Sequence, residues 1–149
     1  MIAVDTNILV YAHREDSQWH SAAVAALTGL AESGTAWAIP WPCVHEFLAI
    51  TTHPRIYAPP TPMATALETI KRWRVSPALR FLGEGPGYLD RLEDVAVASK
   101  SEGAMIHDAR IAALCIVHGV RQLWSADRDF SRFPHIKIVN PLVQVPPKG

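Results

Sequence analysis

Four carboxylate side chains stand where folding can bring them together. Asp5 directly follows a short apolar run, and Asp127 follows another such run near residue 124. Glu46 and Asp108 each lie in the opening turns of an apolar helical segment. Ligands bind at the carboxyl ends of the strands of an open parallel sheet, so these acids can converge at one edge. Grouped anions near an apolar core are costly unless a cation joins them, and oxygen-only ligation suits Mg²⁺ or Mn²⁺.

Each of these acids also has an ordinary structural explanation. Asp5 is a typical helix N-cap, and Asp108 would interact favourably with a helix dipole from the first turn. Asp127 suits a turn, and Glu46 lies off the apolar stripe of its helix, as a solvated residue would. Four such coincidences are less expected than one shared site. Asp129, two residues beyond Asp127, is expected as an outer or supporting acid.

The neighbouring side chains offer little competing chemistry. Arg110 and Arg128 are close in sequence to two of the acids but cannot neutralise the whole group. His45 and His107 each precede a candidate ligand, yet adjacent positions on a helix point about 100° apart. The sequence contains no His-x-x-x-His pair, so a zinc hydrolase site is not expected. The tryptophans are interpreted as core or partner surface and not as a nucleobase platform; they are Trp19, Trp37, Trp41, Trp73 and Trp124.

The elements that must position these acids alternate between short strands and helices. This alternation predicts one α/β domain with three layers (α/β/α) and a mainly parallel central sheet. Apolar runs predict strands at 2–4, 35–40, 122–125 and 136–139. Helical spacing predicts a turn at 8–12 and helices at 17–32, 41–53, 62–73, 88–101 and 105–118. Residues 76–86 are expected to hold a short mixed piece that ends in a glycine-rich loop.

Finer expectations concern the edges of these elements. Ser17 is expected as an N-cap, and residues 14–16 are expected to be exposed. The segment 57–62 holds three prolines and must be a loop. Leu89, Leu92 and Val95 are expected to face inward from their helix, with Asp90, Glu93 and Asp94 on its exposed face.

Composition bounds the function classes. The chain has 149 residues, of which 49% are apolar, so a single folded domain over 1–149 is expected, with a loose tail at 145–149. No apolar run is long enough to cross a membrane, and no basic leader precedes the first apolar residues. Cys43 and Cys115 are interpreted as buried free thiols of a cytoplasmic protein.

The charge balance is neutral. With 14 basic and 14 acidic residues, the chain does not attract nucleic acid through its overall charge. Any such binding must depend on local patches or on a metal. Basic candidates for phosphate contact, each also readable as ordinary surface charge, are Arg14, Lys71, Arg72, Arg74 and Arg80.

With these residues in place, the chain resembles the PIN-domain ribonucleases, and most of all the VapC toxins of bacterial toxin–antitoxin pairs. The resemblance runs from Met1 to about Val143. It rests on the opening Val-Asp-Thr-Asn at 4–7, on Glu46, and on Asp108-Ala109 leading a small-residue helix that ends at His118-Gly119. The motif Ser-Ala-Asp-Arg-Asp-Phe at 125–130 completes it and is the most specific part.

The resemblance implies a metal-dependent endoribonuclease that acts as a toxin. Asp5, Glu46, Asp108 and Asp127 would bind one or two Mg²⁺ or Mn²⁺ ions. Thr6, Asn7, Ser125 and Asp129 would support them, the hydroxyls by hydrogen bonds. The substrate would be RNA, often a tRNA or ribosomal RNA loop. The partners would be a second copy of the chain and a VapB-type antitoxin that places a basic side chain in the acidic pocket.

Three other readings remain open at this stage. A receiver-like phosphoacceptor also gathers Asp residues at strand ends, but it needs adjacent acids and a lysine at a later strand end, whereas Lys137 lies inside its strand. A haloacid-type phosphatase would want a second Asp where Asn7 stands. A catalytically inactive PIN-fold binding protein is the third reading, although all four carboxylates are retained.

Overall fold

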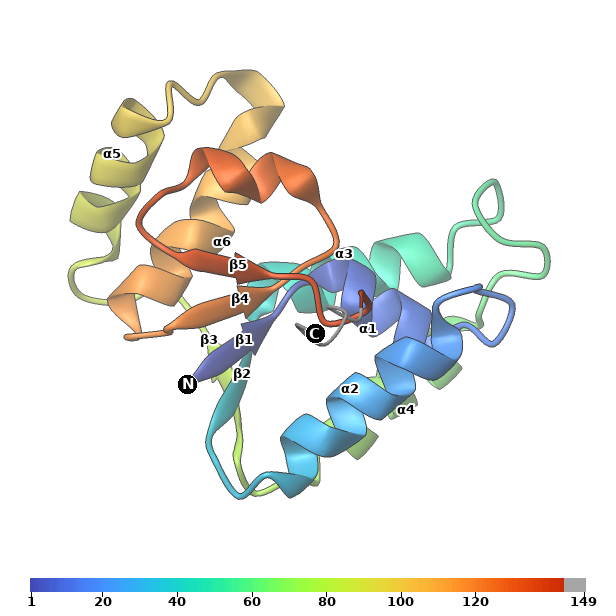
Figure 1. Ribbon diagram of the computed structural model, residues 1–149. Helices are drawn as coiled ribbons and strands as arrows, with labels where there is room; N and C mark the ends of the chain where they lie inside the picture. Colours follow the sequence, from blue (N-terminus) through green and yellow to red (C-terminus); the bar gives the residue numbers. More distant parts are fainter. Residues whose placement is uncertain (144–149) are drawn as a thin grey trace, which may run out of the picture.

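A five-stranded parallel sheet forms the centre of the protein in this computed structural model, which describes residues 1–143 (Figure 1). The predicted loose tail lies outside the described residues. The sheet order is β3-β2-β1-β4-β5, and every pair of neighbours is parallel. The strands are β1 (Ile2–Val4), β2 (Trp37–Pro40), β3 (Leu79–Leu82), β4 (Gln122–Trp124) and β5 (Lys137–Val139). The predicted parallel three-layer architecture is confirmed.

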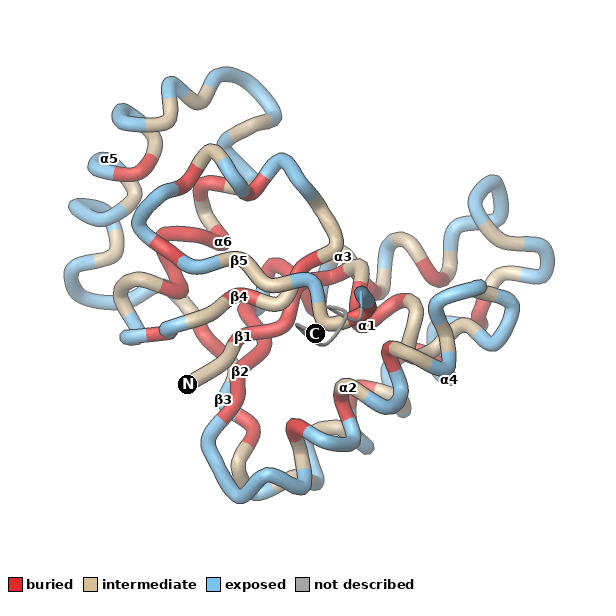
Figure 2. Tube along the Cα trace, viewed as in Figure 1, coloured by how far each residue is buried: buried red, intermediate tan, exposed pale blue. Residues whose placement is uncertain are grey.

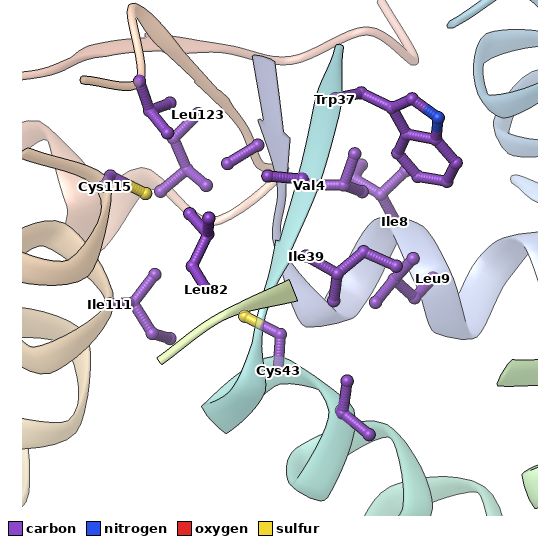
Figure 3. Close-up of a cluster of buried hydrophobic side chains, with 14 of the residues drawn as sticks. Val4, Ile8, Leu9, Trp37, Ile39, Cys43, Leu82, Ile111, Cys115 and Leu123 are labelled. Atoms are coloured by element: carbon purple, nitrogen blue, oxygen red, sulfur yellow. The ribbon is translucent and has the colours of Figure 1, made fainter. Parts of the chain in front are cut away.

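Helices cover both faces of this sheet. They are α1 (Thr6–His13), α2 (His20–Glu32), α3 (Trp41–Thr51), α4 (Met63–Arg74), α5 (Tyr88–Ala98) and α6 (Ile106–Val117), with short 3₁₀ turns η1 (Gly103–Met105) and η2 (Arg128–Arg132). Figure 3 shows Ile111 and Cys115 of α6 on one side of the central strands and Ile8 and Leu9 of α1 on the other. Buried residues follow the central strands, whereas α5 is largely exposed (Figure 2). No helix in residues 1–143 has the length and apolarity needed to cross a bilayer.

The strand order places a topological switch point beside β1. The chain moves outward from β1 to β2 and β3, and then returns to the other side of β1 for β4 and β5. Ligands bind where the order reverses, at the carboxyl ends of the strands. The β1–β4 register pairs Val4 with Trp124, so Asp5 and Ser125 leave the sheet side by side. Helix α3 begins at this edge because it follows β2 directly. Helix α6 also begins there, because it runs back across the sheet to the amino end of β4.

Several element boundaries differ from the sequence expectations. Helix α1 already begins at Thr6, because Asp5 caps it. Ser17 is not an N-cap: its hydroxyl accepts a hydrogen bond from the Trp19 amide in a turn, and α2 begins at His20. The mixed piece within 76–86 contains β3, the edge strand paired with β2. Leu89 is 73% exposed and does not face inward, because α5 packs beside α6 and buries only Val95 completely.

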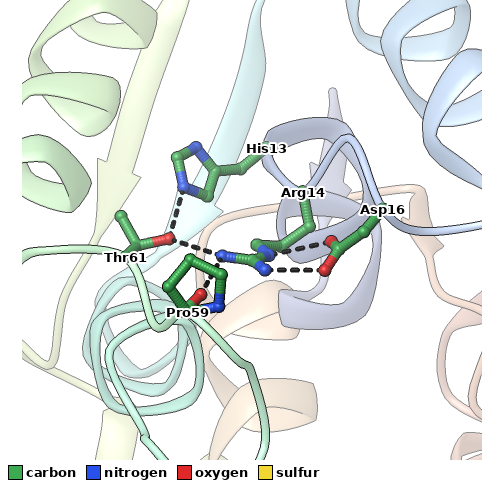
Figure 4. A network of polar contacts seen from close by, with 5 residues as sticks. All are labelled: His13, Arg14, Asp16, Pro59 and Thr61. Carbon is green, nitrogen blue, oxygen red and sulfur yellow. Dashed lines mark hydrogen bonds and ion pairs between the residues drawn. The ribbon is translucent and has the colours of Figure 1, made fainter.

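The arginine that follows α1 is a tether and not an exposed charge. The Arg14 side chain is only 12% exposed; it donates to the Asp16 carboxylate and to the carbonyl oxygen of Pro59 at 3.0 Å (Figure 4). Its guanidinium also lies 4.2 Å from the centre of the Tyr57 ring. Thr61 accepts from Arg14 at 3.3 Å. The proline-rich loop is therefore fastened to the end of α1, which corrects the expectation that residue 14 is exposed.

His13 adds to the same junction through both ring nitrogens. Nε2 lies 3.0 Å from the Thr61 hydroxyl, and Nδ1 lies 3.3 Å from the Thr69 hydroxyl of α4. Burial, followed by the positive charge of Arg14, lowers the pKa of His13. A neutral imidazole donates from one nitrogen and accepts at the other, which fits two hydroxyl partners.

Replacing Arg14 by alanine is expected to lower the free energy of unfolding by about 1–3 kcal/mol, because the loop loses its hydrogen bonds and the stacking on Tyr57. Urea denaturation of the two proteins would measure the difference. The matched control is Arg91→Ala, whose partner Asp94 is exposed, so a change of at most about 0.5 kcal/mol is expected. Equal losses in the two variants would contradict the tethering role.

Candidate active site

Asp5 is both a helix cap and the buried centre of an acidic site. Its Oδ1 accepts a hydrogen bond from the Thr6 amide at 2.8 Å, which caps α1. Its Oδ2 accepts from the Ser125 hydroxyl at 2.7 Å. The Cys43 thiol lies 3.6 Å from Oδ1 and donates a weak hydrogen bond to it. It can act as a donor because burial raises the pKa of the thiol and keeps it protonated. The two readings of Asp5 that the sequence left open are thus compatible.

The environment of Asp5 disfavours its charge. The residue is 4% exposed, and burial raises its carboxyl pKa to about 6, although the hydrogen bonds from Ser125 and Thr6 oppose the shift. The negative charge of Glu46 raises the pKa further. A carboxylate held this way gains from any positive ion that reaches it.

Glu46 is oriented toward this centre by Thr6. The Thr6 hydroxyl donates to Glu46 Oε2 at 3.0 Å, which links the first turn of α1 to the second turn of α3. Cys43, three residues earlier on the same helix, contacts Asp5 from the same side. The helical spacing predicted that Glu46 lies off the apolar stripe, and the hydrogen bond from Thr6 accounts for its orientation.

A second set of hydrogen bonds fixes the loop after β4. Ser125 Oγ accepts from the Asp127 amide at 3.0 Å while its hydroxyl donates to Asp5. Asn7 Oδ1 accepts from the Ala126 amide at 3.2 Å. Asp127 caps η2 by accepting from the Asp129 amide at 2.8 Å. One serine therefore holds both the buried acid of β1 and the backbone of the loop that carries Asp127.

Three further carboxylates gather above this layer. One oxygen each of Asp108, Asp127 and Asp129 lies within 4.8 Å of the others. Burial, and then the charge of Asp127, raises the pKa of Asp108. Asp129 is the exposed member of this cluster, and its role as an outer or supporting acid stays a prediction.

Few cations balance these acids. Within residues 1–143, the ion pair that reaches them joins Arg132 to Asp129 at 4.0 Å. Arg110 instead pairs with Glu84 at 2.6 Å, outside the cluster. The donors are carboxylate oxygens only, and this donor set fits a hard divalent ion such as Mg²⁺ or Mn²⁺.

Two of the acids, Glu46 and Asp108, line a cavity of about 400 Å³ between α3 and α6, whereas Asp127 lines a separate cavity beside Ser125. The wall of the first cavity is formed by Pro42, His45, Glu46, His107, Asp108 and Arg110. Sequence reasoning set both histidines aside, because neighbours on a helix diverge. The structure nevertheless brings them to this wall, since the cavity is wider than one helix face. In the sequence, the one sign that these histidines lie near the site was that they directly precede Glu46 and Asp108.

Comparisons with known proteins identify the fold family. A model of the PIN domain matches residues 2–136. The chain belongs to the PIN-domain family. Ribonuclease VapC48 of Mycobacterium tuberculosis is 33% identical over 138 residues, which cover 92% of this chain and 94% of that protein. The predicted family is confirmed.

Solved structures share the fold of this PIN domain. VapBC2 from Rickettsia felis, bound to a DNA fragment from its promoter, superposes with a TM-score of 0.69 at 17% identity, over 94% of this chain and 98% of that one. VapC20 of M. tuberculosis, a toxin that cleaves the sarcin–ricin loop, gives 0.63 at 16% identity, over 88% and 93%.

None of these findings favours the receiver-like or inactive alternatives. Lys137 is exposed on β5 and is remote in register from the strand end where a phosphoacceptor site would need it. Three of the acids of this PIN domain, Asp5, Glu46 and Asp127, accept specific hydrogen bonds.

Proposed function

We propose that this PIN domain is an Mg²⁺- or Mn²⁺-dependent endoribonuclease that acts as the toxin of a type II toxin–antitoxin pair. The observation that carries the proposal is the acidic group at the switch point of a PIN fold. Asp108, Asp127 and Asp129 cluster within 4.8 Å, and Glu46 lines the same cavity as Asp108. Thr6 and Ser125 hold Glu46 and the buried Asp5, respectively. Relatives named ribonuclease VapC, which align with this chain over nearly their whole length, support the proposal.

Asp5, Glu46, Asp108 and Asp127 would hold the ion, with Asp129 beside them. A bound divalent ion lowers the pKa of its water and neutralises charge that grows on the phosphate. The chain's own residues orient the acids: Thr6 fixes Glu46, and Ser125 and Asn7 fix Asp5 and the loop that carries Asp127. A preorganised set of acids needs no rearrangement when substrate arrives.

The test incubates purified protein with total RNA and with defined tRNA and ribosomal RNA fragments. Cleavage is expected with Mg²⁺ or Mn²⁺ and is expected to stop in excess chelator. Restoring the ion after chelation should restore cleavage, which separates metal loss from denaturation. Binding of RNA without cleavage under all metal conditions would favour the inactive reading and overturn the proposal.

Partners follow from the same proposal. VapBC2 was solved as a toxin–antitoxin assembly on DNA, and a VapB-type antitoxin is the partner we propose here. A basic antitoxin side chain in the acidic cavity would substitute for the ion and block cleavage. We further propose a homodimer and a cytoplasmic site of action, the latter because Cys43 and Cys115 are free thiols.

Replacing Ser125 by alanine is expected to reduce ion affinity and cleavage by about 10- to 100-fold, the usual effect of removing a group that orients metal ligands. Ser125→Thr keeps the hydroxyl and should stay within a few-fold of wild type. Calorimetric titration with Mn²⁺ and initial cleavage rates would measure both. An exposed serine of α2, Ser21, provides the matched alanine control. Unchanged Mn²⁺ affinity in Ser125→Ala would contradict the orienting role.

A further inference from the structure

Trp41 presents a large aromatic surface beside the acidic cavity. It is the first residue of α3 and is 41% exposed. His45 lies four residues later on the same helix, and residues at this spacing share a helix face. His45 and the adjacent Glu46 both line the cavity. Trp41 therefore lies five residues, or about one and a half helical turns, before a proposed metal ligand, Glu46.

The indole is supported and held in one orientation. The Phe81 ring of β3 stacks on it, with ring centres 4.7 Å apart and planes 22° apart. Gly83 packs against its edge so closely that an added Cβ would lie 3.3 Å from the indole Cδ1. The Gly83 carbonyl accepts a hydrogen bond from His118 Nε2 at 2.8 Å, which anchors this stretch to the end of α6. One ring face is thus covered, while a large part of the indole stays open.

His45, which lines the acidic cavity, packs next to the indole. The His45 ring lies nearly parallel to the indole, at 25°, with centres 6.3 Å apart. Arg110, on the same cavity wall, is held in place by Glu84 at 2.6 Å. Flat groups with fixed orientations bind planar ligands at little cost in conformational entropy.

We propose that Trp41, extended by His45, stacks on an unpaired base of the RNA next to the phosphodiester that is cleaved. This inference rests on the proposed ribonuclease function. Proteins recognise single-stranded RNA mainly by stacking splayed bases on aromatic rings, and this attraction does not depend on phosphate charge. The chain has no net positive charge to attract RNA, and the negative potential of its acidic site repels the phosphate backbone. An attraction that does not depend on phosphate charge, such as base stacking, is therefore needed for binding. At 41% exposure Trp41 is not a core residue, so of the two sequence interpretations only that of a partner surface stands beside this proposal.

Binding and cleavage of Trp41 variants test the proposal. Binding would be measured by fluorescence anisotropy in an Asp108→Asn background, with one labelled RNA either unpaired or annealed to its complement. Trp41→Leu keeps an apolar side chain but has no ring, and it should weaken binding to the unpaired RNA by about 10- to 100-fold. Trp41→Phe should stay within about threefold of the parent. Trp19→Ala is the matched control, since Trp19 is 38% exposed directly before α2, and should change nothing.

The outcomes separate this inference from the function on which it rests. Wild-type cleavage with Mg²⁺ is measured first; if Trp41→Leu then cleaves and binds as wild type does, stacking is refuted while the nuclease stands. Absence of both cleavage and RNA binding in the wild type refutes the function and this inference together. Light scattering would report the oligomeric state. A Trp41→Leu protein that changes its number of subunits would identify this surface as an interface between copies and overturn the proposal.

Discussion

Replacing Asp108 by asparagine should lower the rate of RNA cleavage by at least about 100-fold while the protein stays folded. Asp108 is the acid that joins both parts of the site: its oxygen lies in the cluster with Asp127 and Asp129, and its side chain lines the cavity with Glu46. Removing a residue that hydrogen-bonds to a metal ligand usually lowers metal affinity or activity by about 10- to 100-fold. Removing a charged ligand itself should lower the cleavage rate by at least as much. Cleavage rates at several Mn²⁺ concentrations would measure the loss.

The control for this prediction is Asp90→Asn. Asp90 and Asp108 both lie in the first turn of a helix, α5 and α6 respectively, so both variants lose the same interaction with a helix dipole. Only the Asp108 variant should lose cleavage. Because burial and nearby acids raise the pKa of Asp108, its variant should unfold at no lower temperature than wild type. Equal activity of the two variants would remove Asp108 from the site.

Replacing Asp5 by asparagine should stabilise the metal-free protein at pH 7 by about 1–3 kcal/mol. Burial raises the Asp5 pKa from its ordinary 3.8 to about 6, and a shift of about two pKa units corresponds to roughly 3 kcal/mol. Between these two pH values the folded state binds a proton that the unfolded state has released. The free energy of unfolding of the wild type therefore falls as the pH rises from about 4 to 6.

The neutral amide removes this pH dependence. The advantage of the Asp5→Asn protein should thus be full at pH 7 and should vanish near pH 4, where Asp5 is protonated in the wild type. Urea denaturation in chelator at both pH values would measure it. Saturating Mn²⁺ should reverse the order at pH 7, because only the wild type gains fully from ion binding. A variant less stable than wild type in chelator at pH 7 would show that the Asp5 charge is already compensated by its hydrogen bonds.

The two predictions distinguish the roles of the acids. Asp5 is almost completely buried, so we expect its charge to affect stability as strongly as it affects chemistry. Asp108 is half-buried and lies at the cavity wall, so its loss should affect cleavage far more than folding.

Local sequence patterns determined the elements and the identity of the acids. Short runs with apolar residues, each followed by Asp or Ser, specified β1 and β4, because an apolar run bounded by turn formers is typical of a buried strand. The apolar residues around α6 specified a buried helix with Asp108 in its first turn. Boundaries that depend on partners were wrong: Ser17 satisfies a turn, and Leu89 faces away from the core because α5 packs beside α6 and not on the sheet.

Only the tertiary structure decided how these residues meet. That Ser125 serves Asp5 and the Asp127 loop together follows from the β1–β4 register, which no local pattern encodes. The tether of Arg14 to the proline-rich loop, and the support of Trp41 by Phe81, likewise join segments about 40 residues apart or more. The sequence by itself determined which groups can hold an ion, since that depends on residue chemistry and helical or strand period. Their distances, exposure and partners depend on packing between elements, and this was fixed only by the folded chain.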